Sequence, residues 1–228
     1  MIDEAPGLFD HSFDPGSAVS PAGVRYFDGQ INISTTDLST GGFGSTWSQT
    51  RSWSNRSPPS SFNGSGMIDT DRPYLLNPNG DNSEIVLVSN ATDARFFNLV
   101  NGNYVPQFFL QDQLVHNTGT GEFVFTDTVG NQIHFLDWSA SQANQWGQFK
   151  SCTDPKGNTI SVTSWTSDGK VLEMQRSDGT ITQSYLYTYL ASPDPNAGLI
   201  SNVTLRQKVG TGSWTVVRQV NYDYYDGT

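Results

Sequence analysis

Three histidines and one cysteine are the residues of this 228-residue chain best suited to acid–base or nucleophilic chemistry. The histidines, His11, His116 and His134, are far apart in sequence, and no serine stands in the Gly-x-Ser-x-Gly turn that presents a nucleophile after a strand. Cys152 has no second cysteine for a disulfide, and a lone thiol is more often a packed residue than a nucleophile. No pair of Asp or Glu residues is set apart by its neighbours either. We therefore predict that the chain is not an enzyme and has no catalytic residues.

Side-chain oxygens at alternate positions, as in calcium-binding loops, occur in two neighbouring segments. They belong to Asp69, Asp71, Asn77, Asn79, Asp81 and Glu84. An EF-hand loop needs further ligands and a bidentate glutamate at its twelfth position, which the segment Asn77–Glu84 lacks. We therefore interpret both segments as solvated turns and predict no metal and no other cofactor. Calcium binding near Asn77–Glu84 is the alternative that stays open.

Six tryptophans could stack on sugar rings while neighbouring Asn and Asp side chains bond the hydroxyl groups. They are spread along the chain, at Trp47, Trp53, Trp138, Trp146, Trp165 and Trp214. This spread favours packing within the fold over a binding platform. A carbohydrate-binding β-sandwich is therefore the alternative hypothesis, and it requires two or three exposed aromatic residues on one concave face.

The composition favours strands over helices. Hydrophobic residues make up 35% of the chain and aromatic residues 12%, whereas charged residues reach only 15%. Gly, Ser, Thr and Asn are abundant, which suits pleated strands joined by tight turns. We predict an all-β fold in which antiparallel β-hairpins follow one another as a meander or ribbon.

The charge of the chain argues against two classes of partner. Its net charge is −10 with only 12 Lys and Arg residues, whereas nucleic acid and anionic membrane surfaces require a cationic footprint. No apolar run approaches the roughly 18 residues that span a bilayer. We therefore expect no nucleic acid partner and no membrane insertion. The start, MIDEAPGLFD, lacks the basic and apolar regions of a secretory signal, so any such signal is expected upstream.

Three regions are predicted along the chain. Residues 1–22 hold prolines but no hydrophobic period, which predicts an irregular or disordered N-terminal arm. Residues 23–140 hold short apolar runs between turn residues, and the proline-rich residues 56–82 form a loop-rich seam within them. Residues 141–228 hold longer alternating runs, which predict successive β-hairpins. The predicted strands after the seam include residues 84–90, 94–100, 104–110, 121–128, 131–138, 159–165, 171–176 and 181–190.

Two kinds of turn recur between these strands. The Asp-Gly pairs at 28–29, 168–169 and 178–179 can each reverse the chain in two residues. The phrase D-x-x-G-N occurs at 127–131 and at 154–158. It predicts a turn in which Asp accepts backbone N–H bonds and Gly adopts the left-handed conformation. Such recurrence indicates an array of similar units.

Tyrosines form stripes on the last predicted strands. In residues 181–190, one face carries Ile181, Tyr185, Tyr187 and Tyr189. In residues 213–225, one face carries Trp214, Val216, Val220, Tyr222 and Tyr224. We predict that these rings stand opposite or diagonal to one another across neighbouring strands. They would cover a sheet that has no second layer and keep their hydroxyls in water.

Several of these phrases resemble the YD repeats of Rhs proteins. They are the D-x-x-G-N turns, the Ser-Asp-Gly hairpins and the Tyr-x-Tyr strands followed by Asp and Gly, from Tyr187 to Gly198 and from Tyr222 to Gly227. Residues 24–55, VRYFDGQINISTTDLSTGGFGSTWSQTRSWSN, resemble the front region of many bacterial Rhs chains. The chain departs from the pattern where Leu199, rather than Arg, follows Gly198. The resemblance implies a long β-ribbon that spirals into a hollow shell, which encloses a C-terminal effector in many members.

The leading hypothesis is a non-catalytic structural segment that forms or caps the start of such a shell. Its partners would be the downstream repeats of the same larger protein, with a glycan or another cell-surface ligand as a further candidate. The resemblance implies a bacterial protein that is secreted or held at the cell surface. The alternative, the carbohydrate-binding β-sandwich, would also be secreted or displayed on a surface.

Overall fold

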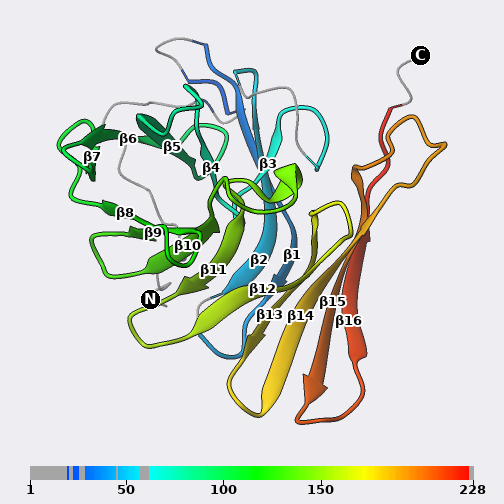
Figure 1. The fold of residues 1–228 in the computed structure, drawn as a ribbon. Helices are drawn as coiled ribbons and strands as arrows, with labels where there is room; N and C mark the ends of the chain where they lie inside the picture. The colour runs from blue at the N-terminus through cyan, green and yellow to red at the C-terminus, as the bar shows by residue number, and fades with distance from the viewer. Residues whose placement is uncertain (1–19, 21–22, 26–28, 45, 57–61, 226–228) are drawn as a thin grey trace.

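The computed structural model describes residue 20 and residues 23–25, 29–44, 46–56 and 62–225, and this part of the chain is all-β (Figure 1). Its strands form two antiparallel sheets, one of 3 strands and one of 13 strands, so the predicted fold class is confirmed. Nearly all of the predicted N-terminal arm, residues 1–22, lies outside the described residues.

The elements have the following bounds. In chain order they are β1 (Asn32–Thr40), β2 (Trp47–Ser54), β3 (Met67–Asp69), β4 (Tyr74–Leu76), β5 (Glu84–Val88), β6 (Ala94–Val100), β7 (Asn103–Pro106), β8 (Gln113–Asn117), β9 (Glu122–Thr126), β10 (Gln132–Leu136), the 3₁₀ turn η1 (Ala143–Gln145), β11 (Phe149–Thr153), β12 (Thr159–Trp165), β13 (Val171–Ser177), β14 (Ile181–Tyr189), β15 (Ile200–Val209) and β16 (Thr215–Asn221). An isolated bridge between Val24 and Ile31 precedes β1, at the predicted Asp28-Gly29 hairpin, whose turn lies partly outside the described residues.

The large sheet is a meander in which each strand pairs with its neighbours in sequence, from β4 to β16. Its first part, β4 to β10, curls round on itself in Figure 1, and the Leu75 N–H donates to the Gly147 carbonyl at 2.8 Å. The sheet does not close into a barrel. Ile133 of β10 stands opposite Cys152 of β11, so strand pairing continues across residue 140. The predicted division of the chain at that residue rests on the sequence repeats and stays a prediction.

The D-x-x-G-N turns have the predicted structure, and the two are alike. Asp127 Oδ1 accepts the backbone N–H groups of Val129 and Asn131, at 3.0 and 2.8 Å. Asp154 Oδ1 accepts those of Lys156 and Asn158, both at 2.9 Å. In each turn the glycine is left-handed, with φ of 94° at residue 130 and 86° at residue 157. One turn joins β9 to β10 and the other joins β11 to β12, so the phrase sets two similar hairpins.

The Ser-Asp-Gly turns also reverse the chain, although with a different geometry from the predicted two-residue turn. Gly169 and Gly179 have φ of 86° and 91°, while neither aspartate before them has a positive φ. A type I′ turn needs a positive φ at both central residues. Of each Asp-Gly pair, only the glycine is in the left-handed region. The Thr166 N–H donates to the Lys170 carbonyl at 2.8 Å, so three residues form that loop, whereas the Asp178 N–H donates to the Ile181 carbonyl at 3.2 Å and encloses Gly179 and Thr180.

One prediction about strand positions is wrong in part. The loop-rich seam 56–82 contains the short strands β3 and β4, which its prolines flank. The strand predicted at 104–110 ends at Pro106, because Phe108 and Phe109 have φ of 61° and 60°, outside the extended region. The strands β8 and β11 lie in segments for which the sequence suggested no strand.

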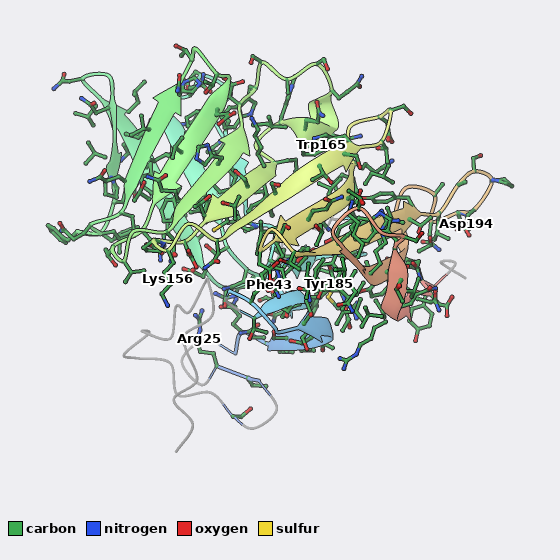
Figure 2. All side chains as sticks on the ribbon, turned by 90° about the horizontal axis from the view of Figure 1, so that it is seen from below. Arg25, Phe43, Lys156, Trp165, Tyr185 and Asp194 are labelled. Atoms are coloured by element: carbon green, nitrogen blue, oxygen red, sulfur yellow. The ribbon has the colours of Figure 1, made fainter. Side chains whose placement is uncertain are left out.

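The small sheet lies across the second part of the large sheet as a second layer, seen from below in Figure 2. Trp47 of β2 and Tyr185 of β14 meet in this interface, and both side chains are buried. Inside the curled first part, Phe97, Phe123 and Phe135 are fully buried. These residues belong to one continuous apolar core, so the two parts of the large sheet share their interior. The predicted sheet without a second layer is therefore wrong.

Candidate functional site

The tyrosines of β14 are the centre of the contact between the two sheets. Tyr185 and Tyr187 are 0% and 2% exposed. The Tyr185 ring meets the Trp47 ring edge-on at 4.3 Å between centroids, and its hydroxyl donates to the Trp47 carbonyl at 3.2 Å. The Tyr187 hydroxyl donates to Gln49 Oε1 at 3.1 Å. Burial raises the pKa of both phenols above the ordinary value, so both stay protonated donors.

The predictions that these hydroxyls lie in water and that the rings face one another are wrong. Across the sheet, Tyr185 stands opposite Leu205 and Tyr187 stands opposite Val203, both aliphatic. The hydroxyls are removed from water because the small sheet packs over them. Its strand β2 supplies their acceptors, the Trp47 carbonyl and Gln49 Oε1. The stripe therefore joins two layers instead of covering one.

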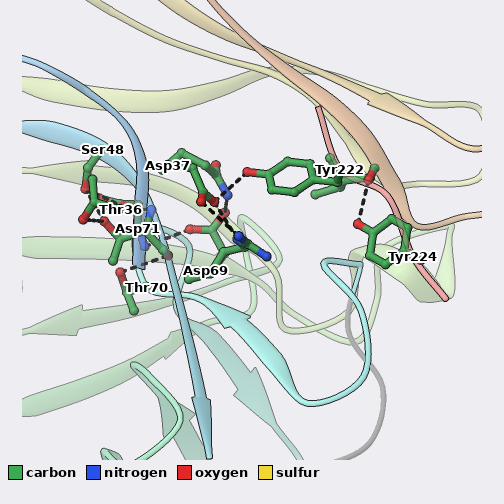
Figure 3. Close-up of polar contacts among 12 residues, drawn as sticks. Thr36, Asp37, Ser48, Asp69, Thr70, Asp71, Tyr222 and Tyr224 are labelled. Atoms are coloured by element: carbon green, nitrogen blue, oxygen red, sulfur yellow. Dashed lines mark hydrogen bonds and ion pairs between the residues drawn. The ribbon is translucent and has the colours of Figure 1, made fainter. Parts of the chain in front are cut away.

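A second contact between the sheets involves Tyr222, which follows β16 (Figure 3). Its hydroxyl donates to Asp37 Oδ2 at 2.8 Å. Arg51 holds the same carboxylate with two hydrogen bonds, from Nε at 2.5 Å and from Nη2 at 2.9 Å. The guanidinium also lies 4.7 Å from the centre of the Tyr222 ring. This network ties the end of β16 to β1 and β2, which are far from it in sequence.

Asp69 is the last residue of β3 and Asp71 lies in the turn that follows, both within the same polar interface. Asp69 Oδ2 accepts from Arg72 Nε at 2.7 Å and from Gln49 Nε2 at 3.0 Å. Asp71 Oδ2 accepts from the Ser48 hydroxyl at 2.9 Å and from the Thr50 N–H at 3.0 Å. Burial and the neighbouring Asp69 charge raise the pKa of Asp71 to about 8. The carboxylate oxygens of Asp69 and Asp71 thus bond groups of the protein itself and help to hold β2 against the turn after β3.

The segment Asn77–Glu84 forms a turn through its own side chains. Asn77 Nδ2 donates to Asn82 Oδ1 at 2.7 Å, and the Asn82 N–H donates to Asn77 Oδ1 at 3.2 Å. Asp81 Oδ1 accepts the Ser83 N–H at 2.9 Å. Among the residues that the structure describes, no three His, Cys, Asp or Glu side chains gather as metal ligands would.

The two histidines of the described chain lie on the sheet and pair with acids. His116 Nε2 is 2.9 Å from Asp137 Oδ2, and the Ser139 hydroxyl donates to the other oxygen of that carboxylate at 2.5 Å. In a catalytic triad the histidine lies between the serine and the acid and takes the proton of the serine. Here the carboxylate lies between His116 and Ser139, so the histidine does not activate the serine. His134 Nδ1 is 2.8 Å from Glu122 Oε2. His11 lies outside the described residues.

Cys152 is buried in the core beside β10. Burial, followed by the charges of Asp127 and Asp154, raises the pKa of its thiol to about 12. A thiol with a raised pKa holds little thiolate at neutral pH, and thiolate is the reactive form. The residue therefore serves as a packed core side chain.

Strand β16 forms one edge of the large sheet, and the apolar stripe predicted on it is broken. Arg206 stands opposite Val216 while Leu205 stands opposite Arg218, which leaves Val217 as a bulge. Trp214 therefore lies on the Arg206 side, with the guanidinium 4.4 Å from its ring centre. The exposed edge carries apolar side chains, with Val216 at 61% and Val217 at 45% exposure.

The backbone of β16 presents hydrogen-bonding groups away from β15. The Tyr222 N–H donates to the Ser201 carbonyl at 2.9 Å, toward β15. Because backbone groups alternate in direction along an antiparallel strand, those of Asn221 and Gln219 point outward. In the described part of the chain, β16 pairs with β15 alone.

An open groove of about 720 Å³ lies between the sheets near β3 and β4. Five separate segments line it: residues 62–63 before β3, the run from β3 to β4, the residues around η1, the β12–β13 turn and the β14–β15 loop. Three aromatic residues lie along it, the half-buried Phe62 and Tyr74 and the exposed Trp146. Sequence spacing could not reveal this groove, because its parts come together only in the fold.

The predicted packing role fits five of the six tryptophans, which are buried or partly buried. Trp146 differs, since 45% of it is exposed.

No family model matches this chain, and no curated protein sequence matches it. The resemblance to Rhs proteins therefore stays a hypothesis from sequence phrases. No helix in the described residues has the length and apolarity to cross a membrane.

Proposed function

We propose that this chain is a non-catalytic structural segment of an Rhs/YD-repeat protein, which forms or caps the start of a β-shell. In this role it contributes a curled sheet whose last strand, β16, continues into the next repeats of the same larger protein. The shell would enclose or display a C-terminal effector, and the whole protein would be secreted or lie at the cell surface.

The observation that carries the proposal is the edge of β16. It combines outward backbone groups at Gln219 and Asn221 with the exposed valines at 216 and 217. An edge of this kind is a template for pairing with a further strand. Tyr222 and Arg51 meanwhile fix the end of the strand against the small sheet. The edge is thus held in place for addition of a strand.

The polar network supports the non-catalytic part of the proposal. Asp37 and Asp71, which do not line the groove, each bond arginine, hydroxyl or backbone donors of the two sheets. Groups engaged in this way stabilise a fixed arrangement, whereas acid–base catalysis needs a group within reach of a substrate.

Self-association through β16 tests the proposal. Because the next strand is absent from an isolated chain, we expect two copies to pair through this edge as the concentration rises. Gln219→Pro removes an outward N–H without removing a bond to β15, and an edge strand tolerates proline at such a position. Sedimentation velocity should therefore show association for the unmodified chain and a monomer for Gln219→Pro.

Gln219→Thr is the matched control, because it keeps the N–H and should associate like the unmodified chain. Far-UV circular dichroism and the unfolding midpoint establish that each variant is folded. A monomeric unmodified chain at every concentration, or equal association of Gln219→Pro, would contradict the proposal.

A further inference from the structure

Trp146 is held in a fixed position at the groove. Its indole N–H donates to the Ala140 carbonyl at 2.9 Å, and its backbone N–H donates to the Ala143 carbonyl at 3.1 Å. The next residue, Gly147, has φ of 68°, and a Cβ there would lie 2.2 Å from the Leu75 carbonyl oxygen. Only glycine allows this approach to β4. An exposed ring fixed by several constraints loses little conformational entropy when a ligand stacks on it.

The charges along the groove cancel in pairs. Asp69 bonds Arg72, with 2.7 Å between Oδ2 and Nε, and Asp168 forms an ion pair with Lys170. Two acids and two bases therefore face the groove in a protein whose net charge is −10. An anionic or cationic ligand would need an unpaired opposite charge, so this groove suits a neutral ligand.

Amide side chains supply neutral hydrogen-bonding groups beside the rings. Asn144, Gln148 and Asn63 all line the groove. In the sequence, Asn144 and Gln148 flank Trp146 and Asn63 follows Phe62. Asn144 Nδ2 donates to the Asp168 carbonyl at 2.8 Å, which ties the η1 segment to the β12–β13 turn. An amide offers both a donor and an acceptor, which is what a hydroxyl group requires of its partner.

We propose that this groove is a binding site for a neutral oligosaccharide, with Trp146 as the ring on which one sugar stacks. A pyranose has a face of C–H groups and a rim of hydroxyls, which match an aromatic face flanked by amides and paired charges. The volume of about 720 Å³ lies within the roughly 300–1,000 Å³ of small-ligand sites. Binding of an oligosaccharide at this site would be a second function, in addition to the structural role proposed above.

Isothermal titration calorimetry with the whole chain tests the site. The probes are the tetrasaccharides of cellulose, starch, xylan, mannan and chitin, with sialyllactose as a charged comparison. We expect saturable binding of at least one neutral probe and none of sialyllactose. Trp146→Ala should weaken that binding by at least about tenfold, as loss of an aromatic anchor does. Asn144→Ala should weaken it by a smaller factor.

Trp214→Ala is the matched control, because Trp214 lies against Arg206 and Lys208 near β16 and should leave the affinity unchanged. The Trp146 indole N–H resonance of the unmodified protein gives a second readout that needs no variant, and it should shift as the sugar saturates. Failure of every neutral probe to bind, an unshifted resonance, or unchanged affinity in a folded Trp146→Ala protein would overturn the proposal.

Discussion

Tyr187 shows how single side chains specify the contact between the sheets. Its hydroxyl and Gln49 Oε1 are both removed from water, and each supplies the hydrogen bond that the other needs. The alternation of residues 181–190 predicted which face this tyrosine occupies, but it could not predict the acceptor. That acceptor lies 138 residues away in sequence.

Tyr187→Phe should therefore destabilise the fold. Gln49 is fully buried and its Nε2 already bonds Asp69, so loss of the phenol leaves Oε1 without its donor. We expect the free energy of unfolding to fall by about 1–3 kcal/mol, measured by urea denaturation. Tyr225→Phe, at a side chain 99% exposed, is the control and should change little. Equal stability of the two variants would show that the buried bond contributes nothing.

Asp71 gives the interface a defined pH dependence. Its pKa is raised from the ordinary value of 3.8 to about 8 in the folded protein. The folded state therefore holds a proton that the unfolded state releases, so this contribution to stability is complete below pH 3.8 and is lost as pH rises toward 8. Asp71→Asn keeps an acceptor for the Thr50 N–H but has no proton to lose.

The expected result is a smaller loss of stability between pH 4 and pH 8 in Asp71→Asn than in the unmodified protein. Urea denaturation across that range measures it, and the comparison between the two proteins cancels the pH dependence that they share. Parallel stability curves for the two proteins would refute this account of Asp71.

At the scale of elements, the D-x-x-G-N turns were predictable because everything that forms them is local. Asp154→Ala removes the acceptor for the N–H groups of Lys156 and Asn158, and Asp127→Ala does the same in the other turn. We expect each substitution to lower the free energy of unfolding by a similar amount, about 1–2 kcal/mol. Chemical denaturation measures both, with the exposed Asp223→Ala as control. A loss in one turn but none in the other would contradict their equivalence.

Other elements were only partly predictable. The alternation of residues 213–225 located β16, yet the bulge at Val217 moved Trp214 and Val216 to the other face. A bulge adds one residue on one strand, and period alone does not reveal where it occurs. The short strands β3 and β4 carry no strand signal in the proline-rich seam, because their pairing with β2 and β5 is what makes them strands.

At the scale of the whole molecule, the sequence predicted a ribbon of hairpins but not how the ribbon is covered. The ribbon follows from neighbouring contacts, whereas the second layer depends on Asp37, Arg51 and Tyr222 meeting across the chain. The groove arises in the same way, from five segments that share no common sequence pattern. Both features are non-local, and so they become visible only in the fold.

The curled meander and its fixed edge together form a body that another strand can extend. One end of the large sheet returns to Gly147 through β4, while the other end, β16, has its outward side open within the described residues. The proposed structural role requires this asymmetry, because growth in one direction needs one open edge.

Amide hydrogen exchange along β16, followed by NMR in the unmodified and Gln219→Pro proteins, tests whether this edge is open and able to pair with a further strand. At low concentration the inward N–H groups of Val220 and Tyr222 should be protected while those of Gln219 and Asn221 exchange freely. At high concentration the outward groups of the unmodified protein should gain protection, and Asn221 in Gln219→Pro should not. Outward groups that are protected in the dilute monomer, or that stay unprotected at every concentration, would contradict the claim.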